Sequence, residues 1–287
     1  MSIAYNYKII IHFDGTRYCG WQYQAPPLKT IQGELIRALK VIAKQRIVVT
    51  GSSRTDAGVH STGLTANFHL RIRIAPESMI KALNSLLPED IRVADCEIVN
   101  KSFNARFSSV MKTYVYRIFF GQVCSPFVVR YVTHIPYPLD LRKMRKAVPY
   151  FIGEKDFSSF TSDDPEKNRL RSVSDFKMRV KGEEIIFTIT GKSFLRYMVR
   201  NIVGTIIDVG RGKINVEDIP AIFEAKDRKR GGQTAPPGGL TLAKVEYFGD
   251  FTLQTTEEEQ PVLPLTVEDT ESEERSVKGE KEEIVLG

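Results

Sequence analysis

One carboxylate and one arginine stand in a loop of small residues that runs from Gly51 to His60. The loop follows the apolar run 47–50, whose β-branched residues are typical of a strand. Glycines let the backbone approach a ligand closely, and a side chain on a rigidly held loop is open to substrate. Asp56 is therefore a candidate nucleophile or general base, with Arg54 close by in sequence. The alternative is an Asx turn, in which Asp56 bonds only the backbone amides that follow it.

Other catalytic chemistries find little support in the sequence. The four histidines and three cysteines form neither an H-E-x-x-H nor a C-x-x-C pattern, so no zinc site is expected. The sequence also has no P-loop, no G-x-G-x-x-G dinucleotide motif and no G-x-S-x-G nucleophile elbow. We therefore expect neither a metal nor an organic cofactor.

The composition is that of a soluble globular protein. The 287 residues are 42% hydrophobic and 26% charged. The longest stretch without Lys, Arg, Asp or Glu is the 14 residues 57–70, which is too short and too polar to cross a membrane. The N-terminal residues do not resemble a secretory signal, and three scattered cysteines indicate reduced thiols. We therefore expect a cytoplasmic protein without membrane association.

The charge is unevenly distributed along the chain. Residues 252–287 hold 11 acidic and 3 basic residues, whereas residues 1–251 hold 38 Lys and Arg against 24 Asp and Glu. A body with a net charge of +14 favours a polyanionic partner, either nucleic acid or an anionic membrane surface. The acidic segment lacks periodicity and is expected to be a disordered tail, which either keeps the protein soluble or competes with RNA for the basic body.

Strand and helix patterns alternate twice along the chain, in two halves of similar content. In the first half, apolar alternation and spacing predict strands at 7–13, 47–50, 64–70 and 91–99 and helices at 31–42, with Thr30 as N-cap, and 76–86. In the second half they predict strands at 114–120, 131–135, 173–180, 184–190 and 240–248 and helices at 141–151, 194–210 and near 216. This content predicts an α+β fold in two lobes, 1–105 and 106–251, with helices packed against antiparallel sheets.

Five segments, taken in order, resemble the motifs of the TruA-type tRNA pseudouridine synthases. The loop matches the family's active-site signature, R-T-D-A-G-V-H, and the other four matches are Y-C-G-W-Q at 18–22, F-N-A-R-F-S at 103–108, K-T-Y-V-Y-R at 112–117 and F-L-R-Y-M-V-R-N-I-V-G at 194–204. Together they cover about residues 7 to 248. The resemblance implies two ferredoxin-like lobes whose antiparallel sheets join, with a catalytic cleft between them. It also implies isomerisation of uridine to pseudouridine at positions 38 to 40 of the tRNA anticodon arm, by a homodimer that needs no cofactor.

The same resemblance assigns roles to individual residues. Asp56 becomes the catalytic carboxylate, and whether it attacks C1′, attacks C6 or removes a proton is left open. Arg200 pairs with Asp56 and keeps the carboxylate ionised. Tyr114 stacks on the flipped uracil, and Leu240 provides an apolar contact to the base.

Two further arginines are implied to contact RNA. Arg54 takes the place that the flipped uridine leaves in the RNA, although a local pair with Asp56 is an alternative. Apart from the resemblance, Arg106 and the basic clusters at 169–171 and 226–230 are expected to contact phosphates, although a single cluster is more often a solvated face. Ser53 departs from the glycine that the family commonly has before the arginine, and a serine fits there if φ is negative.

Three competing functions remain open. The first is a non-catalytic RNA-binding protein on the same scaffold, which would not need a carboxylate in a basic cleft. The second is a pseudouridine synthase for other RNA positions, which these motifs do not distinguish. The third is a hydrolase with a carboxylate nucleophile and a small substrate, which leaves the basic body unexplained.

Overall fold

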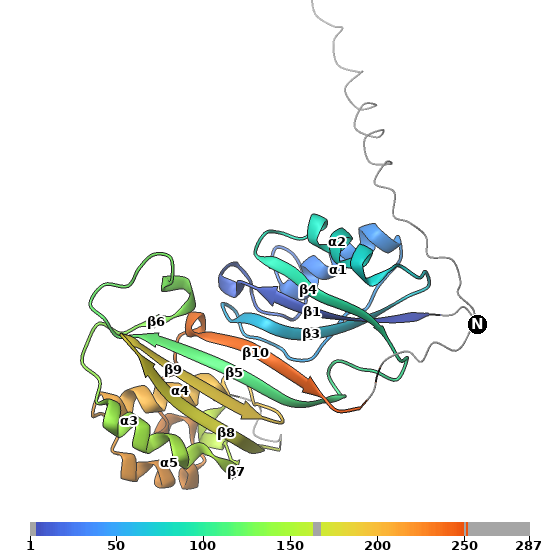
Figure 1. Cartoon of the computed structure of the whole chain (residues 1–287). Helices are drawn as coiled ribbons and strands as arrows, with labels where there is room; N and C mark the ends of the chain where they lie inside the picture. Colours follow the sequence, from blue (N-terminus) through green and yellow to red (C-terminus); the bar gives the residue numbers. More distant parts are fainter. Residues whose placement is uncertain (1–3, 163–167, 250, 252–287) are drawn as a thin grey trace, which may run out of the picture.

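The computed structural model of the protein describes residues 4–162, 168–249 and 251, and the predicted tail 252–287 lies outside them. The described residues form one sheet in the order β4-β1-β3-β10-β5-β9-β8-β7, with β2 paired to β3 and β6 paired to β5 (Figure 1). The strands are β1 (Tyr5–Phe13), β2 (Thr50–Gly51), β3 (His60–Leu70), β4 (Ile91–Val99), β5 (Ser109–Phe119), β6 (Thr133–His134), β7 (Gly153–Asp156), β8 (Leu170–Lys181), β9 (Glu184–Gly191) and β10 (Leu240–Tyr247).

The sheet is built from two successive βαββαβ units. The main strands of the first unit lie in the order β4-β1-β3-β2, and those of the second lie in the matching order β10-β5-β9-β8. The helices are α1 (Ile31–Ala43) and α2 (Pro76–Leu86) in the first unit, and α3 (Leu141–Ala147), α4 (Met198–Gly210) and α5 (Ile219–Ala225) in the second. In Figure 1, α1 and α2 lie with β4, β1 and β3, whereas the other three helices lie with β8 and β9. The predicted α+β fold with two ferredoxin-like halves is confirmed.

The two units join at one edge of β3. β1 occupies the other edge along almost the whole strand. β2 pairs with β3 only at Ala66 and Asn67, and β10 pairs in parallel with β3 at His60 and Ser61. Because β10 also pairs antiparallel with β5, it carries the sheet from one unit into the other. The segment between β2 and β3 therefore lies at the junction of the two units.

Buried side chains of both units belong to one continuous hydrophobic cluster. The predicted boundary between residues 105 and 106 falls in the connection from β4 to β5. Whether the two units are separate domains stays a prediction, and so does the catalytic cleft between them.

Several local elements differ from the sequence-based expectations. The helix expected from residue 194 begins only at Met198, because Tyr197 has a left-handed backbone with φ of +60°. The helix expected over 141–151 changes to a 3₁₀-helix at Val148–Phe151, which contains Pro149 and therefore lacks one amide donor. The strand expected over 47–50 is reduced to β2, and the one over 131–135 to β6.

Two helix boundaries agree with the sequence signals. The side chain of Thr30 accepts a hydrogen bond from the Gly33 amide at the start of α1, as an N-cap should. α4 ends at Gly210, and Gly212 adopts a positive φ of 72° shortly after it.

Candidate active site

Asp56 lies in the segment 52–59, which connects β2 to β3 at the junction of the two units. A tight turn follows it: the Val59 amide donates to the Asp56 carbonyl at 3.2 Å, and Gly58 has φ of +77°. The Oδ2 of its side chain contacts an arginine from the other unit, a contact that an Asx turn alone would not require. With 21% of its side chain exposed, the Asp56 carboxylate is accessible to a ligand.

Backbone hydrogen bonds connect the segment 14–21 to the Asp56 loop. The Trp21 amide donates to the Thr55 carbonyl at 3.1 Å, and the Gly58 amide donates to the Tyr18 carbonyl at 3.3 Å. A Cβ at Gly20 would lie 2.4 Å from the Thr55 carbonyl oxygen, and one at Gly15 would lie 2.0 Å from that of Val59. Only glycine permits this close approach at positions 15 and 20. This explains why the segment that ends in the Y-C-G-W-Q motif at 18–22 accompanies the Asp56 loop.

Arg200 reaches Asp56 from the first turn of α4. Its Nη1 lies 3.2 Å from Asp56 Oδ2, and only 12% of the arginine side chain is exposed. Its Nε donates to the carbonyl of Ala235 at 2.8 Å, and its guanidinium carbon lies 5.0 Å from the centre of the Tyr197 ring. A guanidinium held at three places is a fixed positive charge, and it favours the ionised form of the neighbouring carboxylate.

The glycine-rich segment 231–239 is bound to α4 rather than acting as a free linker. Asn201, Thr205 and Asp208 are buried polar residues of α4. Their side chains bond the segment: Asn201 Oδ1 accepts from the Thr234 hydroxyl at 2.6 Å, and the other two accept from the Gly232 and Gln233 amides. The polar stripe of α4 thereby fixes the carbonyl that Arg200 binds.

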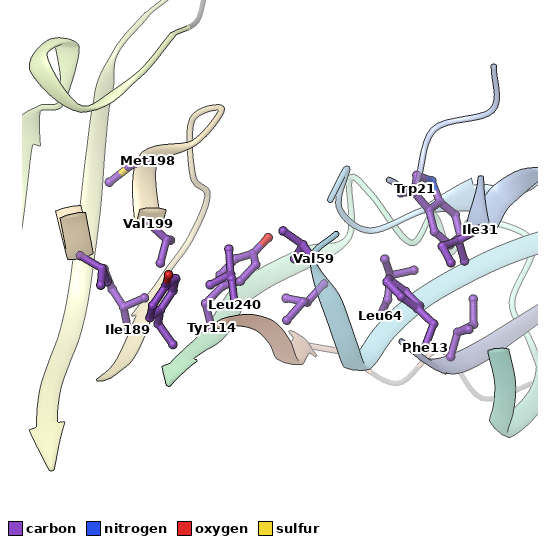
Figure 2. Close-up of a cluster of buried hydrophobic side chains, with 14 of the residues drawn as sticks. Phe13, Trp21, Ile31, Val59, Leu64, Tyr114, Ile189, Met198, Val199 and Leu240 are labelled. Carbon is purple, nitrogen blue, oxygen red and sulfur yellow. The ribbon is translucent and has the colours of Figure 1, made fainter. Parts of the chain in front are cut away.

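Tyr114 and Leu240 lie on neighbouring strands beside this pair. Figure 2 shows both within one apolar cluster that also contains Val59 and Val199. Tyr114 is 8% exposed and Leu240 is 5% exposed. Phe194 packs edge-on against the Tyr114 ring, with the two ring centres 5.2 Å apart. Burial raises the pKa of Tyr114 to about 12, so its hydroxyl is protonated at neutral pH. Both residues sit next to the Asp56 loop, although most of their surface is covered.

The two arginines expected to contact RNA are exposed. Arg54 makes no hydrogen bond or ion pair within the part of the chain that the structure describes, so the alternative local pair with Asp56 is not formed there. Arg106 follows the turn after β4, and its guanidinium carbon lies 5.5 Å from the Phe107 ring centre. Neither arginine contacts Asp56, in contrast to Arg200.

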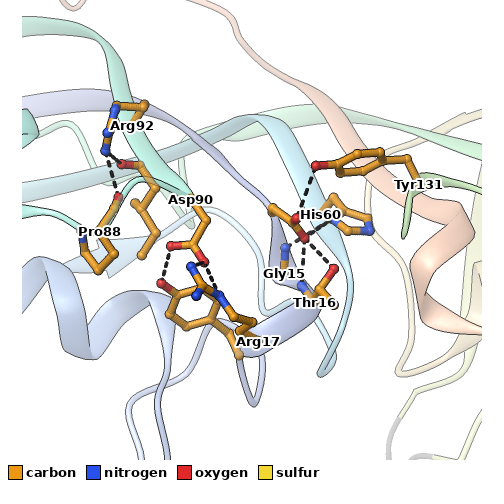
Figure 3. A network of polar contacts seen from close by, with 11 residues as sticks. Gly15, Thr16, Arg17, His60, Pro88, Asp90, Arg92 and Tyr131 are labelled. Atoms are coloured by element: carbon orange, nitrogen blue, oxygen red, sulfur yellow. Dashed lines mark hydrogen bonds and ion pairs between the residues drawn. The ribbon is translucent and has the colours of Figure 1, made fainter. Parts of the chain in front are cut away.

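His60 is a buried histidine whose connections the sequence did not reveal. Its Nδ1 accepts from the Gly15 amide at 3.1 Å (Figure 3), and its Nε2 donates to the Arg130 carbonyl at 2.9 Å. Asp14 lies 3.2 Å from Nδ1 and accepts from the Tyr131 hydroxyl. His60 therefore connects the end of the Asp56 loop to both units, and membership of the loop motif was its only sequence signal.

Lys112, which contacts the loop, and Ser53, which belongs to it, are two residues to which sequence reasoning gave no role in the site. The Lys112 ammonium donates to the Ser52 carbonyl at 2.6 Å. Ser53 Oγ is buried near Tyr114 without a hydrogen bond of good geometry. Lys112 begins the K-T-Y-V-Y-R motif and Ser53 replaces a common glycine, but a lysine in a strand and a serine in a loop do not by themselves indicate these contacts.

No group of three or more His, Cys, Asp or Glu side chains in residues 4–162, 168–249 and 251 is arranged to hold a metal ion. Within the same described residues, no helix is long and apolar enough to cross a membrane. What the site offers is a carboxylate, a fixed guanidinium, a protonated tyrosine and an apolar wall.

Comparison with known proteins identifies the family. A tRNA pseudouridine synthase family model matches residues 9–108 and 147–248. A tRNA pseudouridine synthase A of Thermodesulfovibrio yellowstonii is 42% identical over an alignment of 253 residues, and the match covers 84% of this chain and 99% of that protein. One from Caldicellulosiruptor saccharolyticus is 44% identical over 243 residues, with the same coverage of both chains. The chain therefore belongs to the tRNA pseudouridine synthase family.

Among solved structures, a crystal structure of a Cbf5-Nop10-Gar1 complex matches 70% of this chain and 45% of the other chain. The TM-score is 0.32 and the identity is 14%, so the similarity is weak.

Proposed function

We propose that this protein isomerises uridine to pseudouridine at positions 38 to 40 of the tRNA anticodon arm. The observation that carries the proposal is the Asp56–Arg200 pair, which brings one charged residue from each unit to the junction of the sheet. The reaction breaks the bond between N1 of uracil and C1′ of ribose and forms one between C5 and C1′, while C5 loses its proton and N1 gains one. Because this is a net isomerisation, it consumes no cofactor and needs no redox partner.

Asp56 acts as nucleophile or base in this proposal. A carboxylate that attacks C1′ or C6 divides the reaction into two easier steps, and one that removes a ribose proton assists glycosidic cleavage. Each route requires the ionised form, which Arg200 stabilises from 3.2 Å. The three routes share the same residue and the same charge requirement.

Tyr114 and Leu240 receive the uracil, and Arg54 takes its place in the RNA. Flipping a base out of its stack costs a few kcal/mol, so a side chain that enters the vacated space offsets part of that cost. Because Tyr114 and Leu240 are largely covered, a base reaches them only when neighbours such as Phe194 shift. Arg54 is exposed and has no competing protein partner in the described residues, which suits its role.

The biological setting is part of the same proposal. A net charge of +14 on residues 1–251 supports binding to tRNA. Three free cysteines in the described residues support a reducing compartment, so we place the protein in the cytoplasm. The homodimer rests on the family resemblance.

The decisive variant is Asp56→Asn. Asparagine preserves the size of the side chain and can accept a hydrogen bond, but it lacks the charge of a nucleophile or base. Turnover should vanish while tRNA affinity stays within a few-fold, and Asp175→Asn, which changes a partly exposed carboxylate on β8, should retain activity. Pseudouridine mapping at single-nucleotide resolution measures both rate and position.

The outcomes separate the competing functions. Near wild-type activity in Asp56→Asn protein free of deamidation would remove Asp56 from the mechanism. Modification by the wild-type protein at other positions would indicate a synthase for another RNA site. Binding of tRNA without any pseudouridine would leave an RNA-binding protein on the same scaffold.

A further inference from the structure

Lys112 is a half-buried lysine that contacts the Asp56 loop. It lies on β5 two residues before Tyr114, so the two side chains share a face of the sheet roughly 7 Å apart along the strand. Its Nζ donates to the Ser52 carbonyl at 2.6 Å, which leaves two further N–H donors. Lys112 therefore presents a cation between the loop that carries Asp56 and the strand that carries Tyr114.

Among the described residues, no carboxylate forms an ion pair with Lys112. Arg106 is the charged group that acts on it most closely. Its cross-strand partner on β9 is Gly191, which has no side chain, and its partner on β10 is Val245. Lys244 and Glu246 of β10 lie opposite Thr113 and Met111, hence on the other face, where they pair with each other at 2.9 Å.

This arrangement is costly for the protein alone. Burial, together with the nearby Arg106, lowers the pKa of Lys112 to about 8. A desolvated cation with a single carbonyl acceptor and a second cation beside it contributes little to folding stability. An anion that enters the site removes this cost, because it pairs with both positive charges at once.

We propose that Lys112 and Arg106 form a subsite for an RNA backbone phosphate beside the Asp56 loop. This inference rests on the proposed function and adds a specific contact to it. The remaining Lys112 donors and the Arg106 guanidinium bind phosphate oxygens, while the bond to Ser52 couples the occupied subsite to the loop. The subsite thus holds the backbone of one nucleotide, and the adjoining part of the RNA lies next to Asp56.

The test is equilibrium binding of an unmodified tRNA transcript across a KCl titration, in the Asp56→Asn background so that substrate is not consumed. Lys112→Met should lower affinity roughly fivefold at about 0.1 M salt and reduce the slope of log affinity against log salt by roughly 0.7 to 0.9, the value for one lost phosphate contact. Lys112→Gln, which retains a donor but no charge, should behave in the same way. Lys81→Met removes an exposed lysine from α2 and should leave the slope within error.

The pH dependence supplies a second, independent readout. Lys112 is charged below its pKa of about 8 and neutral above it, so wild-type affinity should fall between pH 7 and pH 9. Lys112→Arg stays charged throughout and should lose this component of the fall, which separates Lys112 from other groups that titrate in the range. The unfolding midpoint of Lys112→Met should be unchanged or higher.

Three results would overturn the phosphate subsite. An unchanged salt slope in both Lys112→Met and Lys112→Gln would show that no phosphate is bound there. A lowered unfolding midpoint with unchanged affinity would assign Lys112 to loop support alone. A pH dependence of affinity that is identical in wild type and Lys112→Arg would show that loss of the Lys112 charge does not weaken RNA binding. Because binding is measured without turnover, none of these results affects the assignment of Asp56.

Discussion

The two βαββαβ units of the sheet share one strand order but differ in their second strand. In the second unit that strand is β8, with 12 residues, and a tight turn at Gly182 leads from it into β9. In the first unit the corresponding strand is β2, with only two residues, and the segment 52–59 leads from it into β3. The same topological position therefore holds a hairpin in one unit and the Asp56 loop in the other.

The shortened strand explains how the site and the junction arise together. Because β2 pairs only with residues 66 and 67, the start of β3 keeps a free edge, and β10 of the second unit pairs there. The pairing is reinforced by Ser61, whose hydroxyl donates to the Leu242 carbonyl at 2.9 Å. The residues that follow the short β2 strand form the Asp56 loop. The second unit, which pairs with β3 through β10, places Arg200 next to the Asp56 carboxylate. Because β2 is short, the backbone at the start of β3 is free to pair with β10, and the chain before β3 is free to form the Asp56 loop.

Arg200→Ala tests the contact that the junction creates, and its expected effect is the largest after that of Asp56→Asn. Loss of a hydrogen bond between charged groups costs about 1.5–3 kcal/mol, which corresponds to a fall in kcat/KM of roughly 10- to 100-fold. Without the guanidinium the ionised carboxylate is less favoured, so the acid limb of the pH–rate profile should move to higher pH. Lysine should restore only part of the rate, because it lacks the planar fork.

Arg179→Ala, which changes an exposed residue of β8, is the matched control and should leave the profile unchanged. An Arg200→Ala enzyme with the wild-type rate and pH profile would show that the junction brings the two residues together without catalytic consequence.

Gly58→Ala and its counterpart Gly182→Ala compare the two connections directly. Both glycines have positive φ, 77° and 58°, so alanine should destabilise either variant by about 1–2 kcal/mol in chemical denaturation. A Cβ at Gly182 meets nothing within 4 Å, whereas one at Gly58 lies 2.9 Å from Pro237 Cγ. We therefore expect only Gly58→Ala to lose activity, roughly tenfold, because the segment that holds Arg200 must shift. Equal activity in the two variants would show that displacing Pro237 does not disturb the geometry of the site.

Much of the fold could be predicted because its signals are local. Apolar spacing and the Thr30 cap locate α1, and alternation locates the β8–β9 hairpin, whose turn contains Gly182. The start of α4 could not be predicted, since the apolar pattern continues through 194–197 while Tyr197 has a left-handed backbone. The guanidinium groups of Arg196 and Arg200 stack on the Tyr197 ring in this conformation, a feature that apolar spacing does not indicate.

The candidate site was only partly accessible from sequence. The Asp56 loop follows from its composition, whereas the contact with Arg200, 144 positions away, came through the family resemblance. Asn201, Thr205 and Asp208 mark a polar stripe at helical spacing, but a sequence does not show that the stripe faces the segment 231–239. Lys112 fits ordinary strand alternation, and its contact with the Ser52 carbonyl, 60 positions away, exists only in three dimensions.

Tyr116→Phe should have the smallest effect and shows how the segment 231–239 is held. The Tyr116 hydroxyl contacts Thr133 Oγ1 and donates to the Pro236 carbonyl at 2.7 Å, so β5 also supports this segment. Its loss should cost about 1 kcal/mol of unfolding free energy. If α4 provides most of the support, kcat/KM should fall no more than about threefold, since Arg200 keeps its contact with Ala235. Tyr7→Phe, which removes a hydroxyl bonded to Ile74 in the first unit, should show a similar loss of stability with unchanged kcat/KM. A fall of tenfold or more in Tyr116→Phe alone would mean that the strand carrying Tyr114 positions the segment as strongly as the helix does.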